Sequence, residues 1–232
     1  LADHLRELRR RILIAAVAIL LATVPGWNLY GPTLDALIRP VTGHGGQVNM
    51  GELTEPFALQ LQVSIFIALI ISSPVWLYEL WAFIVPGLTK REKRTALGFI
   101  ATSAPLFVAG CYLAYLTLPK AVEILLGFTP GTAVNIIGAQ KYITFATRFV
   151  LAFGFAFLLP VFMVALNLIG ILSAKVMLKA WRWAVVGIFV FAAIMTPTPD
   201  PWTMFSLALP MIALYFAAAG VATLNDRIRA RK

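Results

Sequence analysis

The sequence predicts an all-α membrane protein with six transmembrane helices and both termini on the same side of the membrane. Hydrophobic residues make up 60% of the 232 residues and charged residues only 12%, whereas soluble domains have roughly 45–50% and about 25%. Several apolar runs reach the roughly 20 residues that cross a hydrocarbon core of about 30 Å. Because lipid offers the backbone no hydrogen-bonding partners and no alternating strand pattern appears, each run is expected to be a helix.

The apolar runs divide the chain into six expected spans within one integral membrane domain, residues 1–232. The spans are residues 12–30, 58–86, 95–117, 143–172, 181–195 and 202–222. The first run follows a basic stretch, but it is too long for the apolar region of a signal peptide and no cleavage-site pattern follows it. We therefore expect a first span there rather than a cleaved signal.

The positions of the basic residues predict the orientation. Fifteen of the nineteen Lys and Arg residues fall in segments that a six-span topology places on one side of the membrane. These segments are the N-terminal stretch, the loops 87–94 and 173–182, and the C-terminal tail. The positive-inside rule assigns this side to the cytoplasm, so both termini are expected there. The net charge of +9 therefore indicates membrane orientation rather than nucleic-acid binding.

Two of the expected spans have unusual lengths. A helix over residues 58–86 would be roughly 43 Å long and so exceed the bilayer core. This span must tilt, kink at Pro74 or extend into water. A helix over residues 181–195 would reach only roughly 22 Å, and the proline-rich turn 196–201 follows it. The hairpin formed by the fifth and sixth spans would then turn before it reaches the far side of the membrane. This predicts local thinning of the membrane or entry of water from outside.

The two long connections on the other side of the membrane are expected to be ordered caps. Residues 31–57 are rich in Gly and Pro, and residues 118–142 contain a short apolar segment at 121–126 that is expected to form a surface helix. The polar residues Gln140 and Thr144 lie near this face. No internal repeat emerges, which argues against a secondary transporter.

Glu7 lies in the basic N-terminal stretch and has two interpretations. The apolar residues of this stretch share one helical face, so it is expected to lie on the membrane surface before turning into the first span. In the first interpretation Glu7 pairs with Arg10 or Arg11 at helical spacing, a contact worth about 0.2–0.5 kcal/mol. In the second, it receives a cation from a ligand.

Glu92 has the same two interpretations, because it is the single acid in the basic loop 87–94. Either it relieves repulsion among the neighbouring cations, or it acts with Glu7 to accept two arginine side chains of a peptide. Each charge-assisted contact of the second kind contributes roughly 1.5–3 kcal/mol. The residue pattern alone leaves both interpretations open.

The remaining polar residues suggest no enzyme and no cofactor. Glu79 lies within the second span, where it marks either a proton or substrate path or a solvated position near the cytoplasmic mouth. His4 and His44 are far apart and have no further ligand partners, so no metal site is expected. No nucleophile triad, Walker motif or glycine-rich phosphate motif is present in the sequence.

A series of motifs runs in order along essentially the whole chain. The series comprises His4-Leu-Arg-Glu7-Leu-Arg-Arg-Arg11, Glu55-Pro56-Phe57, Ser73-Pro74, Leu77-Tyr78-Glu79-Leu80-Trp81-Ala82-Phe83, Pro86-Gly87-Leu88, Lys90-Arg91-Glu92-Lys93-Arg94, Phe153-Gly154-Phe155 with Pro160, Thr196-Pro197 with Asp200, and Pro210. Together the motifs resemble the TatC family of the twin-arginine protein translocase.

The resemblance implies a fold, a location and a function. It implies six helices in a concave, cupped arrangement in the inner (cytoplasmic) membrane. It also implies a receptor that binds twin-arginine signal peptides at the cytoplasmic face and forms homo-oligomers within a larger complex. With TatA- and TatB-type single-span partners, such a receptor passes folded cargo proteins across the membrane, driven by the proton-motive force.

The resemblance also assigns roles to single residues at the cytoplasmic face. Glu7 and Glu92 match the two carboxylates that receive the arginine pair. Trp81 and Phe83 match a segment of the same site, although an aromatic belt at the membrane interface is the alternative for both.

On the opposite face, Pro40, Glu55 and Phe57 match a periplasmic cap that supports assembly. Asp200 matches an acidic residue of the short hairpin, and the alternative is that it caps the turn before the last span. Thr196 belongs to the same hairpin and is expected to contact partner subunits.

The fourth span departs from the family pattern. The family often has a polar or acidic residue just before the position of Pro160, where this chain has Leu158 and Leu159. An acid there would bind a partner's transmembrane helix. Met204 matches another position at which the family has a polar residue that contacts a partner, and this residue is also apolar here. Partner contacts are therefore expected to rely on Thr196 and nearby polar groups.

Two other function classes explain part of the pattern. A small-molecule transporter or ion channel would explain the spans, Glu79 and Asp200, but it predicts charges at the midplane of facing helices. A structural assembly subunit would make Glu7 and Glu92 dispensable. Neither class explains the motif series.

Overall fold

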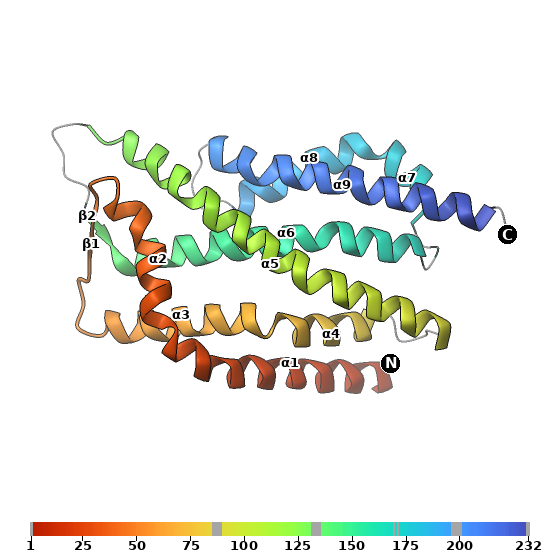
Figure 1. Ribbon diagram of the computed structural model, residues 1–232, viewed down its shortest axis with the longest axis horizontal. Helices are drawn as coiled ribbons and strands as arrows, with labels where there is room; N and C mark the ends of the chain where they lie inside the picture. Colours follow the sequence, from red (N-terminus) through yellow and green to blue (C-terminus); the bar gives the residue numbers. More distant parts are fainter. Residues whose placement is uncertain are drawn as a thin grey trace. The chain divides into compact units, whose positions relative to one another are not determined.

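The computed structural model describes residues 2–84, 90–130, 136–168, 170, 172–195 and 201–230. Helices dominate this part of the chain, as predicted (Figure 1). The helices are α1 (Ala2–Asn28), α2 (Tyr30–Thr42), α3 (Glu55–Ile71), α4 (Ser73–Ile84), α5 (Lys90–Gly127), α6 (Ala139–Leu168), α7 (Ala174–Lys179), α8 (Trp181–Met195) and α9 (Pro201–Ala230). The same part of the chain contains two short strands, β1 (Gln47–Asn49) and β2 (Ile136–Gly138).

The chain forms two compact units, which we describe separately. Unit 1 comprises residues 1–105 and 115–147, and unit 2 comprises residues 106–114 and 148–232. Helices α5 and α6 contribute residues to both units. The expectation of a single domain over residues 1–232 remains a prediction.

In unit 1, helix α1 packs along both α3 and α4. Gly26 allows the close approach of α1 to α3, because a Cβ atom at this position would lie 2.5 Å from the carbonyl oxygen of Ser64. Closely spaced backbones of this kind are a common way for transmembrane helices to associate. The outward face of α1 is apolar and exposed along most of its length, which is typical of a helix that faces lipid.

Helices α3 and α4 are separated by a sharp break, with an angle of 61° between them. The break falls at Ser72, immediately before the Ser73-Pro74 pair. Pro74 has no backbone N–H to donate to the preceding turn, and the indole Nε1 of Trp76 donates to the carbonyl oxygen of Leu69 at 2.9 Å. Of the three arrangements expected for residues 58–86, a kink is the one observed.

The two long connections of unit 1 meet in a small parallel sheet. Strand β1 pairs with β2 in the register Gln47–Ile136 to Asn49–Gly138, and α2 packs against both β1 and α3. Figure 1 shows this region at the end of unit 1 opposite to the start of α1. The composition of residues 31–57 indicated an ordered cap but neither the helix nor the sheet.

The expectation of a separate surface helix at residues 121–126 was wrong. Helix α5 continues without interruption to Gly127, although Pro119 lies inside it. Leu118, Ala121 and Val122 are buried, so tertiary packing extends the helix past the proline.

The N-terminal stretch was also expected to lie on the membrane surface and then turn, and this expectation was wrong as well. Helix α1 runs without a break from Ala2 to Asn28. Neither Gly nor Pro occurs before Pro25, so nothing in the local sequence ends the first turns of the helix.

In unit 2, α8 and the short α7 both pack against α9. The hydroxyl group of Tyr215 donates to the carbonyl oxygen of Met177 at 2.6 Å and so joins α9 to α7. The rings of Phe189 and Phe205 meet edge to face, with 5.5 Å between their centroids, and thereby join α8 to the first turns of α9.

Four helices in the described part of the chain are long and apolar enough to cross a membrane, at Leu5–Asn28, Ala101–Gly127, Ala139–Leu168 and Pro201–Ile228. The bent pair of α3 and α4 adds a fifth if it is counted as one span. Helix α8 is apolar but shorter, and it has the bounds that the sequence predicted for the fifth span. The chain is thus a multi-pass membrane protein, and the count of six spans remains a prediction.

Candidate functional site

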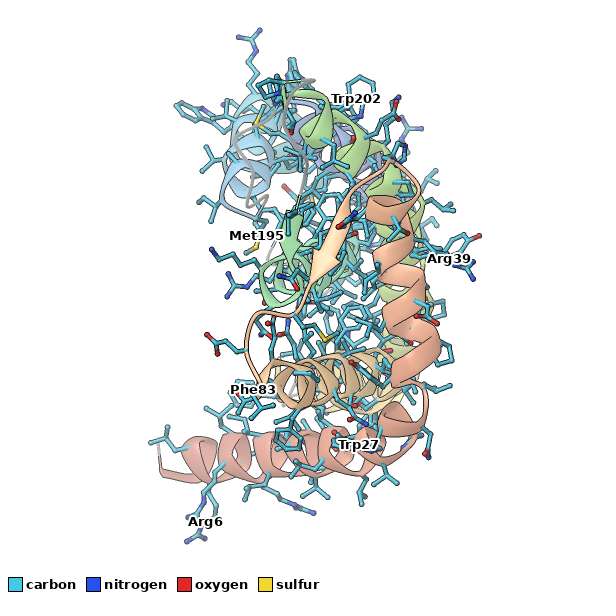
Figure 2. All side chains as sticks on the ribbon, turned by 90° about the vertical axis from the view of Figure 1, so that its left-hand side faces the viewer. Arg6, Trp27, Arg39, Phe83, Met195 and Trp202 are labelled. Carbon is cyan, nitrogen blue, oxygen red and sulfur yellow. The ribbon has the colours of Figure 1, made fainter. Side chains whose placement is uncertain are left out.

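The first turns of α1 and helix α4 lie side by side at one end of unit 1 (Figure 1). Arg6, Arg9 and Arg10 are exposed, and Figure 2 shows Arg6 pointing away from the rest of the unit. Glu7 and Arg11, which are one helical turn apart, are less exposed and contact each other, and Arg11 also contacts α4. This face of α1 therefore carries one acid and one base next to each other.

Arg11 bridges two carboxylates. Its Nη2 atom lies 2.6 Å from Oε1 of Glu7, and its Nη1 atom donates to Oε2 of Glu79 at 2.9 Å. The exposed fractions of the three side chains are 38% for Glu7, 21% for Arg11 and 11% for Glu79. The cluster therefore runs from a half-exposed carboxylate on α1 to a nearly buried one on α4.

The observed pairing shows which neighbouring arginine Glu7 contacts. Glu7 pairs with Arg11 rather than with Arg10, and an ion pair at this spacing contributes only about 0.2–0.5 kcal/mol. The pairing leaves Glu7 partly open to solvent. Its carboxylate can therefore still accept a hydrogen bond from an incoming cation.

The partner of Glu79 could not be identified from the sequence, because Arg11 lies 68 residues away in the chain. One signal was present: an acid within an apolar helix needs a cation or a hydrogen-bond donor on a facing helix. The structure provides that cation from α1, so Glu79 belongs to an ion cluster.

Trp81 is buried, with 2% of its surface exposed. Its indole Nε1 donates to Oγ of Ser103 at 3.1 Å and thereby connects α4 to α5 within unit 1. Trp81 is therefore not part of an exposed aromatic belt at the membrane interface. Phe83 lies two residues further along α4 and is half-buried.

Three predicted site residues fall outside what the structure describes. The side chain of Glu92 is outside the described part, although its backbone belongs to α5. Thr196 and Asp200 lie between α8 and α9, outside the described residues. Of the two leucines that replace a polar residue, Leu158 is buried and Leu159 is half-buried.

At the other end of unit 1, Glu55 joins two connections. Its Oε2 atom accepts hydrogen bonds from the backbone N–H groups of Gly51 and Glu52, and its Oε1 atom accepts one from the N–H of Gln140 at 2.8 Å. Glu55 thus holds the segment before α3 against the start of α6. The family resemblance places Glu55 in the cap, but these contacts could not be predicted from the sequence.

The other two cap residues belong to α2 and to the first turn of α3. Pro40 is buried in α2. Phe57 is exposed over 65% of its surface, and its ring makes a T-shaped contact with the ring of Trp27, with 6.4 Å between the centroids. Figure 2 shows Trp27 near the end of α1.

A polar network continues from the cap into the helices. Nε2 of Gln140 donates to Oε1 of Gln62 at 2.7 Å, and Nε2 of Gln62 donates to the hydroxyl groups of Thr144 and Thr147 at 3.3 Å each. The network joins α3 to α6 inside the apolar part of unit 1. Gln140 and Thr144 were expected near this face, whereas Gln62 was not predicted, although a polar residue within an apolar span was the available signal.

Within the described residues, no group of three or more His, Cys, Asp or Glu side chains is placed to hold a metal ion. What the cluster of Glu7, Arg11 and Glu79 can do chemically is bind cations, since a half-exposed carboxylate accepts strong hydrogen bonds from a guanidinium group.

Comparison with known proteins gives a consistent result. Residues 3–210 match the family model described as Sec-independent protein translocase protein (TatC). The chain is 47% identical over 233 residues to the Sec-independent protein translocase protein TatC of Xylanimonas cellulosilytica, and the match covers 98% of this chain and 84% of the relative. The corresponding protein of Rothia mucilaginosa is 40% identical over 239 residues, covering 100% of this chain and 82% of the relative.

A solved structure agrees with these matches. The crystal structure of a twin-arginine translocase receptor, TatC in DDM, superposes with a TM-score of 0.82 and 31% sequence identity, covering 94% of this chain and 99% of that chain. The chain therefore belongs to the TatC family of Sec-independent protein translocase proteins, a transport family and not an enzyme family.

Proposed function

We propose that this chain is the signal-peptide receptor subunit of a twin-arginine translocase in the inner (cytoplasmic) membrane. We propose six spans, arranged as a concave cup, with both termini in the cytoplasm. Family membership supports the role, and the uneven distribution of Lys and Arg supports the orientation. With this orientation, the cluster of Glu7, Arg11 and Glu79 lies at the cytoplasmic face.

The half-exposed carboxylate of Glu7 carries the proposal. It pairs with Arg11, which also contacts α4, and α4 precedes the basic segment containing Glu92 in the chain. In the proposed complex Glu7 and Glu92 each accept one arginine of the signal peptide. An arginine fork can donate two parallel hydrogen bonds to a carboxylate, whereas a lysine cannot, which gives the receptor its preference for arginine.

The two aromatic residues have different proposed roles. Trp81 is buried and hydrogen-bonded to Ser103, so it keeps α4 in position relative to α5 rather than contacting the peptide. Phe83 is half-buried near the end of α4 and is the aromatic residue that contacts the peptide next to the arginine pair.

Partner subunits complete the proposed function. TatA- and TatB-type single-span proteins bind the chain through Thr196 and Asp200, and copies of the chain associate within the receptor complex. The cap residues Pro40, Glu55 and Phe57 support this assembly from the outer face, and the hydrogen bonds of Glu55 are consistent with a structural role there. The complex transports folded cargo by using the proton-motive force.

Peptide binding tests the proposal. A synthetic twin-arginine signal peptide is titrated against the purified protein in detergent, and the same peptide with both arginines replaced by lysine is the control. We expect the wild type to bind the arginine peptide more tightly, and Glu7→Gln and Glu92→Gln each to lose most of that difference. Glu123→Gln is the matched control, since it removes one exposed carboxylate of α5 far from the proposed site.

Equal binding of both peptides by the wild type would contradict the receptor function. Binding by Glu7→Gln and Glu92→Gln that equals the wild type would mean that these carboxylates only balance local charge.

A further inference from the structure

We propose that Arg11 is a displaceable internal counter-ion: it occupies Glu7 in the free protein, and Glu79 retains it when an arginine of the peptide takes Glu7. This inference rests on the proposed receptor function and adds Arg11 and Glu79 to the residues that determine peptide affinity. Both act through Glu7 and are therefore positioning residues.

The geometry supports an exchange rather than a fixed pair. Arg11 contacts its two carboxylates through different nitrogen atoms, Nη2 toward Glu7 and Nη1 toward Glu79. One contact can therefore break while the other persists. The free protein already holds a guanidinium group on Glu7, so an incoming arginine replaces a group of the same chemistry.

Burial determines which contact breaks first. The Glu79 side chain is 11% exposed and the Glu7 side chain is 38% exposed. Water and salt weaken the more exposed pair, whereas removal of Arg11 from Glu79 would leave a nearly buried charge without its partner. Arg11 therefore stays on Glu79 and releases Glu7.

The remaining donor of Arg11 is consistent with this movement. Its Nε atom is buried and has no hydrogen-bond partner among the described residues. The guanidinium group is thus not saturated in the free protein, and it retains a donor for a further contact after Nη2 leaves Glu7.

The inference predicts opposite effects for two variants. In Glu79→Gln, the carboxylate that holds Arg11 away from Glu7 is absent, so Arg11 remains paired with Glu7. We therefore expect the twin-arginine peptide to bind several-fold more weakly. In the double variant Arg11→Met/Glu79→Met, no buried charge is left unpaired and Glu7 is free, so we expect binding at least about two-fold tighter, given the modest strength of the pair that is removed.

Titration of the twin-arginine and twin-lysine peptides against the wild type, both variants and Glu123→Gln tests the inference, and thermal unfolding in detergent identifies the folded variants. Weaker binding by Glu79→Gln together with tighter binding by the double variant supports it. If Glu79→Gln does not fold, the double variant decides alone. Unchanged or weaker binding by a folded double variant overturns the inference and leaves the receptor function standing, provided that the wild type prefers arginine. A wild type without that preference overturns both.

Discussion

At the scale of single residues, a few polar side chains hold the ends of helices together in each unit. In unit 1, the buried hydroxyl group of Tyr142 donates to the carbonyl oxygen of Leu37 at 2.6 Å and joins α6 to α2. In unit 2, Asp226 accepts from the backbone N–H of Ala174 at 2.9 Å and from the side chain of Asn167 at 3.0 Å. Removal of either hydrogen-bonding group, the Tyr142 hydroxyl or the Asp226 carboxylate, should therefore lower the stability of its unit.

Tyr142→Phe removes one hydroxyl group and keeps the ring. The carbonyl oxygen of Leu37 then loses its side-chain donor in a buried position, so we expect the free energy of unfolding to fall by about 1 kcal/mol. Unfolding in detergent measures the change. Tyr112→Phe is the control, because Tyr112 is largely exposed and its hydroxyl group is expected to contribute little. Equal effects of the two substitutions would contradict the structural role of Tyr142.

Asp226→Ala leaves the N–H group of Ala174 and the buried amide of Asn167 without their carboxylate acceptor. Hydrogen bonds to charged groups contribute roughly 1.5–3 kcal/mol each, so we expect a clear decrease in thermal stability. Asp35→Ala removes an exposed acid of α2 and should have little effect. A stable Asp226→Ala protein would show that α9 does not depend on this contact.

Residue-level prediction succeeded where partners are local. Helical spacing limited the local partner of Glu7 to Arg10 or Arg11, and the structure shows Arg11 in that place. The pairing of Arg11 with Glu79 and the contact between Glu55 and Gln140 join distant parts of the chain. Such contacts depend on how the helices pack against one another, and helix packing cannot be predicted from the spacing of residues in a single sequence.

At the scale of whole helices, the apolar runs predicted most of the spans and some of their ends. Helix α8 has the predicted bounds 181–195, because a cluster of prolines follows it. Helix α5 extends to Gly127 instead of ending near residue 117, since buried side chains outweigh the effect of Pro119. The helix and strand in the connection 31–57 were not predicted, because they are short and depend on contacts with α3 and β2.

Gly154→Ala tests a close helix crossing in unit 2. A Cβ atom at Gly154 would lie 2.7 Å from Sγ of Cys111 and 2.7 Å from the ring of Phe107, both on α5. We therefore expect a loss of about 1–3 kcal/mol in stability as α5 and α6 are forced apart. Gly187→Ala is the matched control, because nothing lies within 4 Å of a Cβ atom there, and Ala favours the helix by roughly 0.5–1 kcal/mol. Similar unfolding temperatures for both variants would contradict the proposed tight packing.

At the scale of the whole molecule, the distribution of charge predicts the topology. Cysteine labelling tests this prediction with Arg6→Cys and Arg39→Cys, because both arginines are exposed and point away from unit 1 (Figure 2). An impermeant thiol reagent added outside intact cells should label Arg39→Cys and not Arg6→Cys, and membrane disruption should make Arg6→Cys reactive. The native Cys111 is buried and should give little background. Labelling of Arg6→Cys from outside would invert the proposed orientation.

The central claim is that Glu7 and Glu92 receive the two arginines of a signal peptide, and photo-crosslinking tests it most directly. A photoreactive residue is placed next to the arginine pair of the peptide, and mass spectrometry locates the crosslinks on the wild-type protein. We predict crosslinks to the first turns of α1, to the end of α4 and to residues 90–94, and their loss when the arginines are replaced by lysine. Crosslinks confined to the cap around Glu55, or unchanged by that replacement, would contradict the claim.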